Sequence, residues 1–187
     1  ARDMAKISKA ALENETFRYV ACKSNYYIAP TNKDKHGKEL WNHHKMVKRT
    51  MYVYDGVEGG KTGYTTKAGG TLVTFAKRGD QELIVVDLCA HGYELYEDTI
   101  KMLNYGFNNY KTIAPFKTME MVLQDDEYGF LTTGNKLSPY KIPLNHLKDV
   151  TVMLEKNQPA SNLTYKCKGS KYTVSYNGKQ IGSGKLK

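Results

Sequence analysis

Apolar residues near the start of the chain recur at helical spacing. Met4, Ile7 and Ala11 share one face of residues 1–13, and the alanines in this stretch favour a helix. The pattern predicts a helix over residues 1–13 and a second, short helix over 15–22. The Ser, Thr, Asp or Asn that normally caps a helix does not precede the first one, so we expect the chain to begin inside a domain.

The next fifty residues carry little periodicity. Residues 23–50 are rich in lysine and contain Pro30, which predicts a mostly exposed loop with Trp41 as its apolar anchor. Residues 51–70 hold six glycines. Glycine allows tight turns and close approach of the backbone to a neighbour, so we expect one or both here.

Two β-rich runs follow at residues 71–78 and 81–88. Gly79 and Asp80 separate them, which predicts a two-residue hairpin turn. Residues 83–86 are Leu-Ile-Val-Val, apolar on both faces, so we expect a central strand that is covered on both sides.

An amphipathic helix is predicted after this hairpin. Its apolar face contains Leu95, Tyr96, Ile100, Leu103 and Phe107, with Gly106 near its end. A strand pair with helices on both sides in sequence indicates mixed α and β layers.

Residues 113–187 alternate in short runs and are predicted to form a small all-β domain. Strands are expected at residues 151–154, 163–167 and 172–176, with Asn177-Gly178 as a hairpin turn. After Glu155 there are seven lysines and no acidic residue. These lysines form a solvated face or a surface for anionic lipid headgroups or wall polymers.

Composition excludes several classes of protein. The chain has 187 residues, of which 40% are hydrophobic and 25% charged, so wholesale disorder is excluded. Three scattered cysteines exclude a disulfide scaffold, and no apolar run approaches the ~18 residues of a membrane helix. The net charge of +9 favours anionic partners.

The motif that carries chemistry is Lys61-Thr62-Gly63. Alone it is a weak signal, because a glycine-rich turn into a strand contains such residues by accident. In serine acylating enzymes that recognise penicillin, Lys-Thr-Gly lies on a strand beside the active site. There the lysine attracts a substrate carboxylate, the threonine hydroxyl can donate a hydrogen bond to it, and the glycine lets a peptide lie against the strand.

Residues 1–110 resemble the D-alanyl-D-alanine carboxypeptidases, the low-molecular-mass penicillin-binding proteins. The most specific string is Asp-Gly-Val-Glu-Gly-Gly-Lys-Thr-Gly-Tyr-Thr at residues 55–65. The other matches run in the same order as in that family: Ala1-Arg2-Asp3-Met4-Ala5, Pro30-Thr31-Asn32, Leu40-Trp41-Asn42 with Lys45, Ala68-Gly69, Ala76-Lys77-Arg78 and Leu103-Asn104-Tyr105-Gly106-Phe107.

The resemblance implies a mixed α/β (α+β) fold. Residues 1–112 would be the C-terminal half of a β-lactamase/transpeptidase-like domain, and residues 113–187 the small β-rich C-terminal domain. It implies a bacterial, extracytoplasmic serine peptidase that removes the terminal D-alanine from peptidoglycan stem peptides through an acyl-enzyme, which β-lactams trap. Lys61, Thr62 and Gly63 would bind substrate, and no metal or cofactor would be needed.

The family's other two motifs are not found in their expected order. Ser138 with Lys141 matches Ser-x-x-Lys and Ser175 with Asn177 matches Ser-x-Asn, but both follow Lys-Thr-Gly and are interpreted as chance matches. We therefore expect the nucleophilic serine and its lysine to lie upstream of Ala1, and this chain alone to be inactive. The missing N-terminal segment would then be a partner, possibly as a separate chain.

Half of a sheet-centred domain leaves apolar faces uncovered, notably around residues 83–86. We therefore expect this chain to be poorly folded unless the upstream segment is present.

Three alternatives remain open. His43-His44 could be a zinc site or two ordinary loop histidines. No acid or cysteine accompanies them at the spacing of zinc ligands, which favours loop histidines. A non-catalytic peptidoglycan-binding protein of the same fold would keep the substrate strand without the chemistry. A basic nucleic-acid-binding module suits the charge of +9 and the fifteen tyrosines, but no RNA-binding signature or helix-turn-helix pattern supports it, and we expect no nucleic-acid partner.

Overall fold

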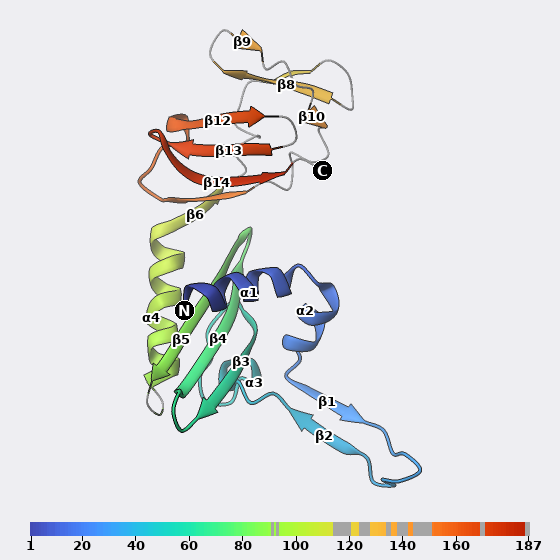
Figure 1. The fold of residues 1–187 in the computed structure, drawn as a ribbon. Helices are drawn as coiled ribbons and strands as arrows, with labels where there is room; N and C mark the ends of the chain where they lie inside the picture. The colour runs from blue at the N-terminus through green and yellow to red at the C-terminus, as the bar shows by residue number, and fades with distance from the viewer. Residues whose placement is uncertain are drawn as a thin grey trace. The chain divides into compact units, whose positions relative to one another are not determined.

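The computed structural model divides the chain into two compact units, Ala1–Asn108 and Asn109–Lys187. The structure describes residues 1–113 apart from 91 and 93, and then 121–123, 128–133, 136–137, 142–143, 151–168 and 171–185. Helices and antiparallel sheets together give a mixed α+β fold, which confirms the predicted fold class (Figure 1).

The first unit is built on a three-stranded antiparallel sheet. Its strands are β3 (Val57–Thr65), β4 (Gly69–Arg78) and β5 (Gln81–Ala90), in the order β3-β4-β5. The hairpin between β4 and β5 is confirmed, and Gly79 in its turn has a positive φ of 57°. The prediction that residues 83–86 form a central strand is wrong, because β4 is central and β5 is an edge of the described sheet.

Helices on both faces of the sheet explain why β5 is apolar on both sides. Helix α1 (Arg2–Leu12) brings Leu12 against Val73 and Phe75 on one face, with Ile84 and Val86 beside them. Helix α4 (Glu94–Asn109) covers the other face (Figure 1).

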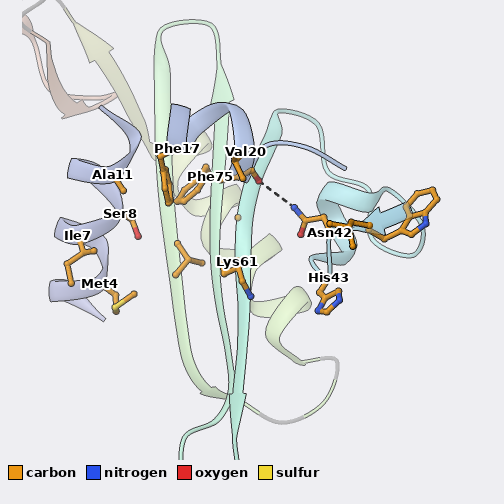
Figure 2. Close-up of a pocket in the computed structure, with 15 residues that line it drawn as sticks. Met4, Ile7, Ser8, Ala11, Phe17, Val20, Asn42, His43, Lys61 and Phe75 are labelled. Carbon is orange, nitrogen blue, oxygen red and sulfur yellow. Dashed lines mark hydrogen bonds between the residues drawn. The ribbon is translucent and has the colours of Figure 1, made fainter. Parts of the chain in front are cut away.

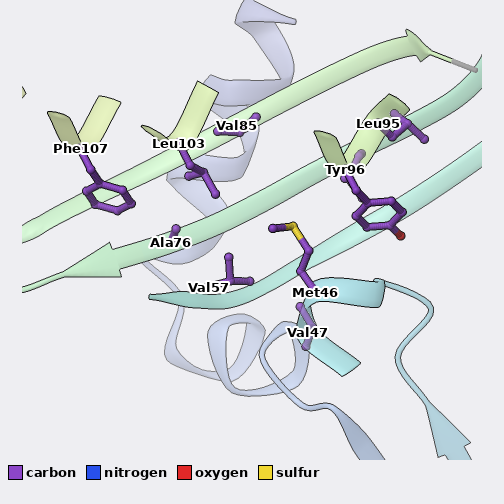
Figure 3. Close-up of a cluster of buried hydrophobic side chains, with 10 residues drawn as sticks. Met46, Val47, Val57, Ala76, Val85, Leu95, Tyr96, Leu103 and Phe107 are labelled. Atoms are coloured by element: carbon purple, nitrogen blue, oxygen red, sulfur yellow. The ribbon is translucent and has the colours of Figure 1, made fainter. Parts of the chain in front are cut away.

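The main core lies between the sheet and α4. Ten buried residues form it (Figure 3): Met46, Val47, Val57, Leu72, Ala76, Val85, Leu95, Tyr96, Leu103 and Phe107. Gly106 lies within α4, where an added Cβ would come within 2.6 Å of Leu83 Cδ1. Its role is therefore close packing of the helix against the sheet.

The second predicted helix is α2 (Glu15–Ala21). Asn14 caps it, because its side-chain oxygen accepts a hydrogen bond of 2.9 Å from the Phe17 backbone N–H. Arg18 of α2 donates hydrogen bonds to Glu58 at 3.1 Å and Glu82 at 2.6 Å. These contacts fasten the helix to strands β3 and β5.

The stretch predicted as a loop contains regular structure. Strands β1 (Asn25–Ile28) and β2 (Lys38–Trp41) form an antiparallel hairpin. The residues of both strands are exposed, and α3 (Lys45–Lys48) follows. Trp41 is 47% exposed, so its expected role as the apolar anchor is wrong. Met46 and Val47 are the buried residues of this segment.

Within the described part of the second unit, all regular elements are strands except the short 3₁₀ helix η2 (Ala160–Asn162). Strand β6 (Tyr110–Ile113) pairs with β11 (Val152–Glu155). The strands β12 (Leu163–Lys168), β13 (Lys171–Tyr176) and β14 (Lys179–Lys185) form a meander.

The predicted turn at Asn177-Gly178 joins β13 to β14. Both residues have positive φ, 48° and 79°, as a two-residue hairpin turn requires. Val152, Leu154 and Val174 are buried in this unit. A further small sheet contains β7 (Met121–Leu123), β8 (Tyr128–Thr133), β9 (Lys136–Leu137) and β10 (Ile142–Pro143).

None of the helices in the described ranges is long and apolar enough to cross a membrane.

Candidate substrate-binding site

Strand β3 carries Lys61-Thr62-Gly63 along one edge of the sheet. It pairs with β4 on one side only, with Lys61 opposite Val73, Thr62 opposite Leu72 and Gly63 opposite Thr71. No second strand pairs with β3 within the described part of the chain. Its outer backbone groups therefore face away from the sheet, which is the geometry that an added peptide strand uses.

The two glycines before Lys61 are packed from opposite sides. A Cβ on Gly59 would come within 2.7 Å of Cys22 Sγ, at the end of α2. A Cβ on Gly60 would come within 2.6 Å of the His44 ring and would clash with the Val73 carbonyl oxygen. The glycine-rich stretch is thus a strand that neighbours approach closely.

A cleft of about 730 Å³ opens on the sheet face that carries α1 and α2 (Figure 2). Most of its lining is apolar and comes from α1, α2, β2 and β4: Met4, Ile7, Ala11, Phe17, Val20, Ala21, Leu40, Trp41, Val73 and Phe75. Ile7 is 59% exposed and Val20 is 63% exposed. This cleft therefore leaves apolar side chains uncovered. The expectation that the uncovered apolar face lies around residues 83–86 is wrong, because these residues pack against the two cores.

Lys61 is the cation of the cleft wall. Its side chain is exposed and its Nζ donates a hydrogen bond of 2.6 Å to the Thr62 carbonyl oxygen. Among the described residues, no carboxylate lies within ion-pair distance of this ammonium. An ammonium has three N–H donors, so Lys61 can bind an anion that enters the cleft.

Thr62 and Gly63 follow Lys61 on β3 but do not line the cleft. Of the two serines in chance matches, Ser175 lies on β13 in the second unit, and Ser138 lies outside the described residues. Ser8 of α1 lines the cleft and is buried. No spacing motif singles out Ser8, so a search for Ser-x-x-Lys passes over it.

The two adjacent histidines have different environments. His43 is exposed and lines the cleft. His44 also lies outside helix and strand, at the N-cap position of α3, as a loop histidine would, but it is fully buried. Its Nε2 lies 2.8 Å from Thr74 Oγ1 in a hydrogen bond, and burial lowers the pKa of the imidazole to about 4. The described residues contain no group of three or more His, Cys, Asp or Glu able to hold a metal ion.

The sequence profile of the D-alanyl-D-alanine carboxypeptidases matches residues 1–92. D-alanyl-D-alanine carboxypeptidase DacC of Escherichia coli (strain K12) is 30% identical over 119 residues, which cover 63% of this chain and 27% of DacC. The match thus spans about a quarter of the length of that relative.

Solved structures extend the similarity. A variant of the DD-transpeptidase of Streptomyces K15 is 30% identical, with a TM-score of 0.51 over 57% of this chain and 42% of that one. Penicillin binding protein 5 of Haemophilus influenzae has a TM-score of 0.60 over 99% of this chain and 54% of its own, and at 22% identity it shows a shared fold. Over residues 1–92, just under half of its length, this chain is similar to the D-alanyl-D-alanine carboxypeptidase family.

Proposed function

We propose that this chain supplies the substrate-binding strand of a serine-type D-Ala-D-Ala carboxypeptidase. Such an enzyme removes the terminal D-alanine from peptidoglycan stem peptides through an acyl-enzyme. The observation that carries the proposal is Lys61, an exposed cation with no carboxylate partner among the described residues, placed on an open sheet edge at an apolar cleft. The similarity of residues 1–92 to the family supports the same proposal.

The chemistry of each residue fits this role. The C-terminal carboxylate of a stem peptide, or the carboxylate of a penicillin, would meet the Lys61 ammonium in a charge-assisted hydrogen bond. The Thr62 hydroxyl would donate a second bond, and Gly63 would let the peptide backbone approach the outer edge of β3. Lys61, Thr62 and Gly63 together form the proposed substrate-binding set.

The nucleophile is proposed to come from polypeptide that this sequence does not include. An acylating serine needs an adjacent base, and no described serine at the cleft has a hydrogen bond to a lysine. The exposed apolar lining of the cleft suits a segment that carries Ser-x-x-Lys and Ser-x-Asn. We call this chain together with that upstream segment the complemented protein.

The remaining proposals follow from the same reading. Residues 1–112 are the C-terminal half of the penicillin-binding domain, and residues 113–187 are its small β-rich companion. The enzyme works outside the bacterial cytoplasm on peptidoglycan, and β-lactams inhibit it. Lys156, Lys166 and Lys171 are exposed on the second unit and would contact anionic wall polymers or lipid headgroups.

Replacing Lys61 tests the substrate-binding role. In the complemented protein, K61A should lower the rate of acylation by labelled penicillin at least about tenfold, because one charge-assisted contact is lost. K77A is the matched control, since Lys77 is exposed on β4 and lies outside the cleft lining. Equal rates for wild type and K61A would remove the assignment.

The non-catalytic alternative predicts a different result. A wall-binding protein of this fold would bind peptidoglycan through the same strand and form no covalent penicillin adduct in any combination of segments. It is supported by the open edge of β3 that carries Lys61 at the cleft, because binding an added peptide strand there needs no nucleophile.

A further inference from the structure

We infer that His44 is a positioning residue for Lys61, acting on it through Gly60 from the opposite face of the sheet. The fully buried His44 imidazole lies directly beside Gly60. It occupies the space in which any residue other than glycine would place its side chain. This role rests on the proposed function of Lys61.

The imidazole is fixed against both strands of the substrate edge. Thr74 of β4 lies opposite Gly60 of β3 in the register, and the His44 Nε2 lies 2.8 Å from Thr74 Oγ1. A Cβ on Gly60 would be 2.6 Å from His44 Cδ2 and 2.8 Å from Nε2. The ring therefore packs against the Gly60 backbone while its hydrogen bond holds it to the neighbouring strand.

Because Gly60 and Lys61 are adjacent on β3, the contact of His44 with Gly60 influences the position of Lys61. Successive residues of a strand point to opposite faces, so the side chain of Lys61 and the His44 ring lie on opposite sides of β3. Lys61 pairs with Val73, which lines the cleft, whereas Gly60 pairs with Thr74 on the core side. A shift of the peptide between Gly60 and Lys61 would change the direction in which the ammonium leaves the strand.

The ring is also held from the side of α4. Tyr96 packs edge-on against it, with ring centroids 5.7 Å apart and an interplanar angle of 84°. Tyr96 in turn stacks on Tyr52 at 4.7 Å. His44 is thus wedged between α4 and the substrate strand.

The main chain of His44 is anchored as well. Its N–H donates a hydrogen bond of 2.9 Å to Asn42 Oδ1, and Asn42 Nδ2 donates one of 3.0 Å to the Lys23 carbonyl oxygen. Asn42 and His43 line the cleft that Lys61 faces (Figure 2). The segment therefore connects the cleft wall to the core immediately beside Lys61.

A double-mutant cycle on penicillin acylation tests this role. In the complemented protein, H44L should lower the acylation rate about tenfold, since small misplacements of a binding group cost rate. In a K61A background, H44L should lower the acylation rate little further, because both substitutions remove the same contribution of the Lys61 ammonium. H44Q should recover most of the rate, since its amide nitrogen can reach Thr74, whereas the shorter H44N should not.

The matched control is T99V. Thr99 is fully buried on α4, and its hydroxyl has no hydrogen-bond partner among the described residues, so T99V should leave the acylation rate unchanged. If H44L does not fold, the comparison of H44Q with H44N carries the test.

Three results would overturn the role of His44. The first is an additive cycle, in which H44L and K61A each lower the rate independently. The second is a wild-type rate in H44L, and the third is equal rates in H44Q and H44N. A K61A variant that reacts like wild type would instead refute the proposed function itself, so the two failures are distinguishable.

Discussion

Gly60 is a position where the substrate strand packs directly against the buried His44 ring and the backbone of β4. G60A should destabilise the complemented protein by about 3 kcal/mol, because the new methyl group meets the Val73 carbonyl oxygen and the His44 ring, neither of which can move freely. G63A should cost less, since its Cβ meets Thr71 Oγ1 at 2.6 Å, a hydroxyl that can rotate away. Urea unfolding measures both, and equal losses would contradict this packing.

The burial of His44 predicts how stability depends on pH. Its folded pKa of about 4 lies below the unfolded value near 6.5, so the unfolded chain binds more protons between these values. Stability should therefore be full above about pH 6.5 and fall as the pH drops towards 4, by about 3 kcal/mol from this group.

The variant H44Q isolates that contribution. Glutamine does not titrate, so the fall in unfolding free energy between pH 6.5 and 4 should be about 3 kcal/mol smaller in H44Q than in wild type. Denaturant unfolding at a series of pH values measures the difference. Parallel pH profiles for the two proteins would show that His44 keeps an ordinary pKa in the fold.

At the scale of elements, Arg18 joins α2 to two strands of the sheet. R18M keeps much of the apolar stem and removes the bonds to Glu58 and Glu82, so it should cost about 1 kcal/mol. The loss is modest because these side chains are about one third exposed and solvent screens the charges. The hydrogen bond to Glu82 also raises the pKa of the Arg18 guanidinium.

K101M is the control for R18M. Lys101 forms an exposed pair with Asp98 within α4 at 2.8 Å, and solvent screens the charges of such a pair so that it adds little stability. Urea unfolding at low and high salt should show a larger, salt-sensitive loss for R18M. The same small loss in both variants would mean that Arg18 does not fasten α2 to the sheet.

The strongly patterned elements were predictable from the sequence. The β4–β5 hairpin follows from Gly79-Asp80 between two β-rich runs, and α4 follows from its apolar face. Strand β5 looked central because it is apolar on both sides, but α1 and α4 provide that cover. The β1–β2 hairpin was not predicted, because its strands are exposed on both faces and show no alternation of apolar and polar residues.

The site was predictable only in part. The Lys-Thr-Gly string identifies Lys61, because the chemistry and the order of neighbouring motifs are local in sequence. The cleft is assembled from α1, α2, the segment at residues 40–43, β3 and β4, so it appears only in three dimensions. The burial of His44 was not predictable for the same reason, since it depends on Thr74 and Tyr96, 30 and 52 positions later in the chain.

For the whole molecule, the open cleft predicts how the upstream segment binds. Val20 lines the cleft on α2 and is 63% exposed, so V20K should change the stability of this chain little. It should weaken complementation about tenfold or more, because a charge would be buried beneath the docked segment. Titrating the segment into each variant, with penicillin acylation as the readout, gives the apparent affinity.

M102K serves as the control for V20K. Met102 is also an exposed apolar residue on a helix, at 39% exposure, but it belongs to α4 and lies outside the cleft lining. M102K should complement as well as wild type. If V20K complements equally well, the segment does not dock in this cleft.

The central claim is that this chain supplies the substrate strand and another segment supplies the nucleophile. The most direct measurement is incubation of labelled penicillin with the 187-residue chain and with the complemented protein, followed by peptide mass spectrometry of the adduct. We predict no adduct on the chain alone and an adduct on a serine of the added segment in the complemented protein. An adduct on Ser8, Ser138 or Ser175 of the isolated chain would contradict the claim.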